Sequence, residues 1–101
     1  MKYFKSHWDE SRGDEYDHWG NCWYYFEIST DNYARRQIEK YENNNSLKYD
    51  LSSHSYDKYG FLTDQPFDIS ENYLIEIDKN EFENEWKQSG YIDGNEQWSN
   101  A

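Results

Sequence analysis

The sequence predicts a small α+β domain, in which an antiparallel sheet of about four strands in meander order packs against one main C-terminal helix. Segments rich in aromatic and β-branched residues occupy the first half of the chain, which is typical of strands. A helix signal follows near the end, where Asp78 and Glu81 have the spacing of a capping box. Strands first and a helix last favour a sheet that is covered by a helix.

The first two strands are predicted by their aromatic content. Residues 2–8 (KYFKSHW) form the first, and residues 22–29 (CWYYFEIS) form the second. Alternation along the second strand places Tyr24, Phe26 and Ile28 on one face, and Trp23, Tyr25 and Glu27 on the other. We expect the Phe26 face to meet the core and the opposite face to be open.

The next two strands are predicted to form a hairpin. Residues 34–42 (ARRQIEKYE) fit the period of a helix or of a strand. As a strand they direct Ile38 inward, between Arg36 and Lys40, and leave these side chains outward: Arg35, Gln37, Glu39 and Tyr41. Residues 46–51 (SLKYDL) alternate as a half-buried strand does. The Asn triplet at 43–45 favours a hairpin turn, because Asn tolerates a positive φ.

The second half of the chain holds a long loop and helix signals. Residues 52–68 are polar and rich in turn-forming residues, which predicts an ordered loop. Residues 70–76 predict a brief helix begun by Ser70. The main helix follows Asp78, carries Phe82 and Trp86 on one face, and is ended by Gly90. We treat residues 1–101 as a single domain, with a core over 2–88 and a tail over 89–101.

Charge and aromatic content point to the kind of partner. The chain has 21 Asp and Glu residues, 10 Lys and Arg residues, a formal net charge of -11, and 21% aromatic residues. Such a charge repels nucleic acids and anionic membranes and attracts basic proteins. Tyr and Trp are the usual anchors of protein interfaces. The composition therefore predicts a basic protein as partner, and neither a nucleic acid nor a membrane.

The sequence offers little catalytic or metal-binding chemistry. His7, His18 and His54 lack the spacing of metal ligands, and no acidic segment matches a calcium loop. Cys22 is the only cysteine, so an intramolecular disulfide is excluded. An enzyme built around Cys22 and His18 remains an alternative. We expect no enzyme, no cofactor and no metal, and the lack of a signal or membrane-spanning segment favours a cytoplasmic protein.

A series of motifs over residues 2–88 resembles a known family. The motifs are a KYFK strand, a strand ending in FEI, RRQIEKY, an Asn-rich turn, LKYD, YDKYG-x-L and an EFENEW helix. They resemble the small bacterial immunity proteins of polymorphic toxin and contact-dependent growth inhibition systems. The resemblance implies that the chain binds and neutralises one cognate toxin domain, a ribonuclease or other nuclease with a basic surface. The chain departs from the family in the acidic segment around 9–17 and in the aromatic tail.

Ten residues are the candidate partner contacts, chosen for charge or aromatic character. They are Asp9, Glu10, Asp14, Glu15, Asp17, Trp19, Trp23, Tyr25, Glu27 and Asp57. In the segment 9–17, Arg12 alone opposes five acids. Acids in this number also keep a protein soluble, which is the plain alternative. A second alternative is a non-enzymatic adaptor module for another basic protein or for a carbohydrate.

Overall fold

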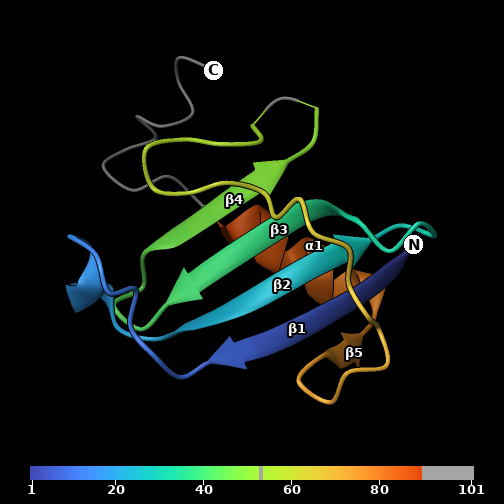
Figure 1. Ribbon diagram of the computed structural model, residues 1–101, viewed down its shortest axis with the longest axis horizontal. Helices are drawn as coiled ribbons and strands as arrows, with labels where there is room; N and C mark the ends of the chain where they lie inside the picture. The colour runs from blue at the N-terminus through green and yellow to red at the C-terminus, as the bar shows by residue number, and fades with distance from the viewer. Residues whose placement is uncertain (53, 90–101) are drawn as a thin grey trace.

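The computed structural model describes residues 1–52 and 54–89 and contains a five-stranded antiparallel sheet with one helix packed against it. Four consecutive strands form the predicted meander: β1 (Lys2–Trp8), β2 (Cys22–Ile28), β3 (Ala34–Tyr41) and β4 (Ser46–Asp50). A fifth strand, β5 (Ile75–Ile77), pairs antiparallel with β1, so the sheet order is β4-β3-β2-β1-β5 (Figure 1). The predicted α+β class is confirmed, with one strand more than the sequence suggested.

The brief helix predicted over residues 70–76 is wrong. Turns occupy the start of this segment, where Asp68 Oδ1 accepts hydrogen bonds from the Ser70 backbone N–H at 3.0 Å and from its hydroxyl at 2.6 Å. The chain then extends as β5, with Ile75 opposite Lys5 and Ile77 opposite Tyr3. The free edge of β1 offers backbone hydrogen-bonding partners to this segment. Its β-branched residues favour a strand, and a helix this short is unstable on its own.

The main helix, α1 (Lys79–Gln88), lies behind the sheet in Figure 1. Its predicted capping residue is confirmed, because Asp78 Oδ1 accepts a hydrogen bond from the Glu81 backbone N–H at 2.8 Å. Phe82 and Trp86 stack on one side of the helix with ring centroids 6.3 Å apart. The predicted helix stop at Gly90, and the tail from residue 90 onward, lie outside the described residues. Among those described, no helix is long and apolar enough to cross a membrane.

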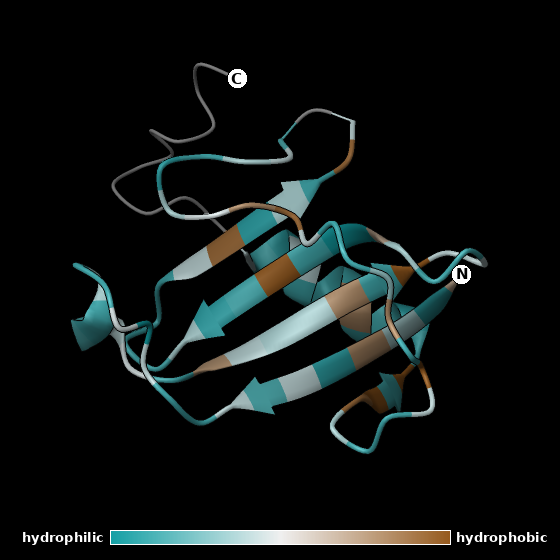
Figure 2. Ribbon diagram, in the orientation of Figure 1, coloured by the Kyte–Doolittle hydropathy of each residue, from teal (hydrophilic) through white to brown (hydrophobic). Residues whose placement is uncertain are grey.

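The two faces of the sheet are covered by different parts of the chain. We call the face beneath α1 the helix face; its buried hydrophobic cluster consists of Tyr3, Tyr25 and Ile38 from the sheet and Phe82 from α1. The other face we call the loop face, because the segment 54–74 runs across it (Figure 1). Buried side chains on the loop face include Phe4, Phe26, Ile28, Leu47 and Tyr49. Aromatic rings thus fill both layers, so the strands show only isolated strongly hydrophobic positions in Figure 2.

Two predictions about side-chain direction are wrong because both faces are covered. The face with Trp23 and Tyr25 is not open: α1 packs on it, and Tyr25 is buried. Ile38 is fully buried as predicted, but Gln37, Glu39 and Tyr41 are buried as well, on the loop face. Alternation distinguishes a core face from a solvent face only where one side of a sheet meets water.

Candidate functional site

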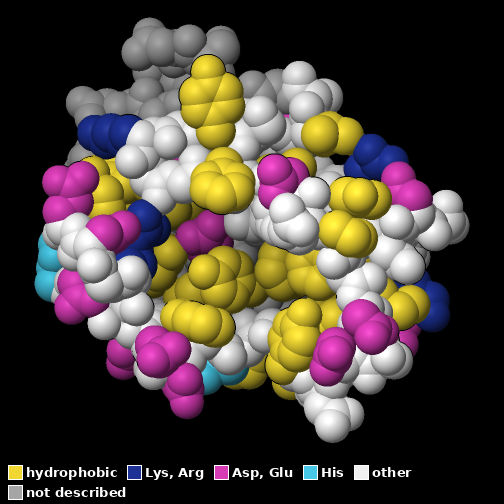
Figure 3. Space-filling view, viewed as in Figure 1, with side chains coloured by type: hydrophobic (Ala, Val, Ile, Leu, Met, Phe, Trp, Pro, Cys, Tyr) yellow, Lys and Arg dark blue, Asp and Glu magenta, His cyan; other side chains and the backbone are white. Residues whose placement is uncertain are grey.

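A cavity of about 580 Å³ opens on the loop face above the middle of the sheet. Its walls come from the β1–β2 loop (residues 9–21) and from the segment 54–74, which rise on either side of β2 and β3. Figure 3 shows the hollow in this face, with hydrophobic side chains gathered in it and carboxylates around it. The aromatic side chains that line it are Trp8, Tyr24, Phe26, Tyr41, Tyr59, Phe61 and Phe67.

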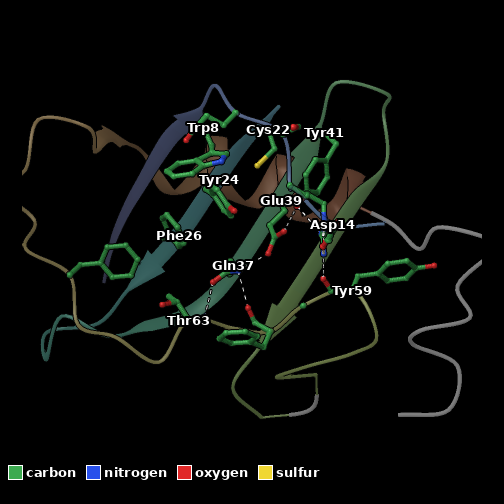
Figure 4. Close-up of a pocket in the computed structure, with 16 residues that line it drawn as sticks. Trp8, Asp14, Cys22, Tyr24, Phe26, Gln37, Glu39, Tyr41, Tyr59 and Thr63 are labelled. Atoms are coloured by element: carbon green, nitrogen blue, oxygen red, sulfur yellow. Dashed lines mark hydrogen bonds and ion pairs between the residues drawn. The ribbon is translucent and has the colours of Figure 1, made fainter. Parts of the chain in front are cut away.

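Glu39 lies in the cavity lining with its side chain almost wholly buried (Figure 4). Its Oε1 accepts a hydrogen bond from the Tyr41 hydroxyl at 2.6 Å, and its Oε2 accepts one from Gln37 Nε2 at 2.8 Å. Burial raises the pKa of this carboxyl above its ordinary value. Within residues 1–52 and 54–89, no Lys, Arg or His lies at ion-pair distance from Glu39. The carboxylate is therefore held by neutral donors only.

Gln37 ties the floor of the cavity to its wall. Besides bonding Glu39, its Nε2 donates to the Phe61 carbonyl at 3.1 Å. Its Oε1 accepts a hydrogen bond from the Thr63 backbone N–H at 2.9 Å. Three of the hydrogen bonds that a side-chain amide can make are thereby used. Gln37 fixes the position of the segment 61–63 over the sheet and the orientation of Glu39.

Arg12 forms part of the cavity wall and is held in a box of aromatic rings. Its guanidinium carbon lies 5.3 Å from the ring centroids of Tyr16 and Trp19 and 5.8 Å from that of Tyr41. It donates to the Tyr41 hydroxyl at 3.1 Å, which in turn donates to Glu39. It also pairs with Asp14 at 3.0 Å and donates to the Tyr59 carbonyl. Tyr41 thus lies between Arg12 and Glu39, and the positive charge of Arg12 acts on the Glu39 carboxyl through space, where it partly offsets the effect of burial on its pKa.

Asp57 shapes the loop that forms one side of the cavity. Its Oδ1 accepts hydrogen bonds from the Tyr49 hydroxyl at 2.9 Å, the Tyr59 backbone N–H at 2.8 Å and the Gly60 backbone N–H at 3.1 Å. Its Oδ2 is buried and has no hydrogen-bond partner among the described residues. Asp57, a candidate partner contact, therefore holds the turn 57–60 in place.

The five candidate acids of the β1–β2 loop are all exposed: Asp9, Glu10, Asp14, Glu15 and Asp17. Glu10 and Asp14 also line the cavity, so this part of the prediction forms one surface with it. Asp14 and Asp17 help to fold the loop as well, since Asp17 Oδ1 accepts from the Gly13 backbone N–H at 2.7 Å. A short 3₁₀ helix, η1 (Asp17–Trp19), follows.

The remaining candidates lie inside the protein or on the helix face. Trp19, Tyr25 and Glu27 are 4%, 6% and 9% exposed, so they offer a partner almost no surface, and we leave them out of the proposed interface. Trp23 is partly buried on the helix face, with Lys5 Nζ 5.3 Å from its ring centroid. The choice of Trp23 and Tyr25 followed from treating the helix face as open, whereas Trp19 is buried in the core of the loop face.

Glu27 has a structural partner on the helix face. Arg36 donates to both of its carboxylate oxygens, at 3.0 and 2.8 Å, and to both oxygens of Glu83 on α1, at 3.0 and 2.6 Å. Burial acts to raise the pKa of Glu27, but the hydrogen bonds and charge of Arg36 outweigh it and hold the pKa below its ordinary value. This triad joins α1 to the sheet.

Five residues of the cavity lining were not among the candidates predicted from the sequence: Glu39, Gln37, Tyr41, Arg12 and Phe61. One signal was available: residues 56–62 (YDKYGFL) carry three aromatics, which indicates a segment that packs on a sheet face. Glu39 itself gave no signal, since alternation placed it opposite the buried Ile38.

The surroundings of Cys22 and of the acidic residues test two alternatives, an enzyme that uses Cys22 and a metal-binding site. Cys22 is 2% exposed, and burial raises the pKa of its thiol to about 12, so the thiol stays protonated at neutral pH. The described residues contain no group of three or more His, Cys, Asp or Glu side chains that could hold a metal ion. The cavity thus offers three carboxylates, one guanidinium and several aromatic rings, which are groups suited to binding.

Comparison of the chain with protein-family models, with curated proteins and with solved structures found no match.

Proposed function

We propose that this protein is an immunity protein, a non-enzymatic inhibitor that binds a basic toxin domain in the cytoplasm and occludes its active site or substrate surface. One observation carries the proposal: the loop face joins an aromatic hollow to an acidic rim (Figure 3). Protein interfaces commonly have an apolar centre rich in aromatics and a polar edge. The net charge of -11 suits a basic partner.

Exposed aromatic side chains on the loop face support this assignment. Trp8 is 50% exposed and Phe61 is 61% exposed, and both line the cavity. Phe61 also borders a neighbouring groove that is lined by Tyr33, Leu51 and Tyr56, all exposed. Large apolar side chains exposed together mark sites of interaction in soluble proteins. The hollow and the groove thus form one candidate surface, because Phe61 belongs to both.

The mechanism we propose is electrostatic capture followed by aromatic anchoring. The acids of the β1–β2 loop raise the rate of encounter with a basic surface, an effect that reaches about 10- to 1000-fold. Trp8 and Phe61 then fill recesses of the partner, while carboxylates such as Glu10 occupy positions where substrate phosphates would lie. Charged pairs that are desolvated at the centre of the interface set the rate of dissociation, and exposed charges at its edge set the rate of association.

The test begins with capture of the partner, using the product of the adjacent upstream gene and the tagged full-length chain. Capture of one basic toxin domain, and silencing of its nuclease activity at equimolar inhibitor, is the expected result. The absence of binding at low salt, where electrostatic capture is strongest, would exclude this reading. A carbohydrate ligand, the other class we considered, would bind with little dependence on salt.

The interface is then tested with two variants of equal charge. One neutralises loop acids (Asp9→Asn, Glu10→Gln, Glu15→Gln), and the other adds cations to the exposed outer side of α1 (Asn80→Lys, Asn84→Lys, Gln88→Lys). Each raises the net charge by three from -11. We expect several-fold slower association for the loop variant alone, with a weaker salt dependence. Equal association rates for both variants would show that the β1–β2 loop is not part of the interface.

A further inference from the structure

We propose that the cavity on the loop face binds one arginine side chain of the basic partner, with Glu39 as its counter-charge. This inference rests on the proposed function and adds to it the group that the hollow recognises. Nothing in the acidic rim alone singles out such a site. Three features of the cavity support it: the buried carboxylate, the charge of the lining and the shape of the walls.

A cation is the ligand that the carboxylate lacks. Glu39 is 6% exposed and accepts one hydrogen bond at each oxygen, from Tyr41 and from Gln37. An ionised carboxylate offers about four acceptor positions, so about two remain for a ligand. A buried carboxylate is stable in its ionised form only when a charge compensates it. A cation entering the cavity restores that compensation and uses the remaining acceptor positions.

The charge of the whole lining also favours a cation. The cavity is lined by three carboxylates, Glu10, Asp14 and Glu39, and by one guanidinium, Arg12. Arg12 is already paired with Asp14 at 3.0 Å, so it leaves the excess negative charge on Glu10 and Glu39. An anionic ligand would meet this excess and also the net charge of the protein, -11.

The walls favour a guanidinium over a compact ammonium. Aromatic rings such as Tyr24, Phe26 and Phe61 line the cavity, and a planar guanidinium stacks on such rings while it bonds a carboxylate through a fixed pair of N–H groups. The protein already holds two guanidinium groups in this manner. Arg12 lies against three aromatic rings, and Arg36 lies 4.8 Å from the ring centroid of Phe82 while bonding two carboxylates.

The volume of the cavity is sufficient for such an occupant. Its 580 Å³ lies within the range of about 300–1000 Å³ that accommodates small-molecule ligands. The opening between the β1–β2 loop and the segment 54–74 faces solvent, so a side chain enters with its backbone resting on the rim. There the exposed rings of Trp8 and Phe61 meet the residues that flank the arginine.

The test is a titration of the full-length ¹⁵N-labelled chain, followed by NMR, with N-acetyl-arginine methylamide. Matched probes carry citrulline, which is neutral and of similar shape, or lysine. Gln37 and Gly60 serve as reporters, because the Gln37 side-chain amide bonds Glu39 and Gly60 borders the cavity. We expect saturable shifts at both with the arginine probe, at concentrations on the order of millimolar, and none with citrulline.

Variants connect the binding to one carboxylate. Glu39→Gln keeps the shape of the side chain and should weaken arginine binding at least tenfold. Glu71→Gln changes an exposed acid outside the cavity lining and should leave it unchanged. A measurement in the unaltered protein is independent of how the variant folds: saturation with the arginine probe should lower the pKa of Glu39, followed by its ¹³C carboxyl shift.

Several results would overturn the inference. These are an arginine response without saturation up to 100 mM, an equal response to citrulline, unchanged binding by Glu39→Gln, or an unchanged pKa of Glu39. Lysine binding as tight as arginine binding would overturn the preference for a guanidinium. Because no toxin enters this assay, its failure beside successful toxin capture leaves the proposed function standing. Arginine binding without toxin capture would instead contradict the proposed function and leave the arginine site standing.

Discussion

Replacing Phe82 with alanine tests whether the helix face is closed to partners. Phe82 is fully buried, with its ring centroid 5.3 Å from that of Tyr3 and the Arg36 guanidinium 4.8 Å away. It is the buried residue through which α1, a helix of ten residues, enters the core of the helix face. Truncation of a buried Phe to Ala costs about 3–5 kcal/mol, because it removes apolar contact and leaves a cavity. Such a loss is a large part of the total of about 5–15 kcal/mol typical of a domain.

Urea unfolding followed by tryptophan fluorescence measures this loss. With a slope of about 1–3 kcal/mol per M, the midpoint of Phe82→Ala should fall by about 2 M urea. Phe61→Ala is the matched control, since Phe61 is 61% exposed and its loss should change stability by less than about 0.5 kcal/mol. A cost below about 1 kcal/mol for Phe82→Ala would refute the reasoning. It would mean that α1 is weakly held and that the helix face is accessible to a partner.

Three further predictions follow from the electrostatics of the buried groups. Arg36→Ala leaves Glu27 without its cation and should cost about 3 kcal/mol in urea unfolding, against less than about 1 kcal/mol for Arg35→Ala, which breaks an exposed pair. Glu39 has a folded-state pKa raised above its ordinary value of 4.5, so the free energy of unfolding should fall as pH rises from 4.5 through the folded-state pKa. In Glu39→Gln this fall should disappear, so that the variant is the more stable protein at neutral pH and the two stabilities approach each other at acid pH. Iodoacetamide should modify Cys22 at least 100-fold more slowly in the native protein than in urea, as measured by mass spectrometry, because the buried thiol has a pKa of about 12.

The strands of the meander were predictable because each carries its own local signal. Residues 2–8 form β1 with the predicted ends, and the predicted hairpin appears as β3 and β4. The turn between them uses Asn44 at a φ of 73°, as the Asn triplet suggested. Asp78 caps α1 through the interaction that its spacing to Glu81 predicted. Aromatic content, turn residues and caps act over a few neighbouring residues, so a single sequence records them.

The cavity was not predictable, because it depends on which segments cover which face of the sheet. Residue alternation divided β3 correctly into two sets, yet it assigned Glu39 to solvent and Ile38 to the core, whereas both are buried. The strand β5 depends in the same way on the free edge of β1, more than 60 residues earlier in the chain. Contacts between segments far apart in the sequence decide these features, and local propensity gives way to them.

The position of Glu39 in the sheet favours a binding role for its carboxylate. Its register neighbours are Tyr24 on β2 and Leu47 on β4, both hydrophobic side chains on the same face. An apolar residue at this position would pack among them without the desolvation that an ionised carboxylate suffers. Such a residue would leave the Tyr41 hydroxyl and the Gln37 amide without their acceptor. The fold thus gives a reason for a hydrogen-bond acceptor at this position but none for a charged one, and groups that lower stability are found where function requires them. A binding role predicts that one substitution, Glu39→Gln, raises stability at neutral pH and weakens arginine binding; a purely structural role predicts no effect on binding.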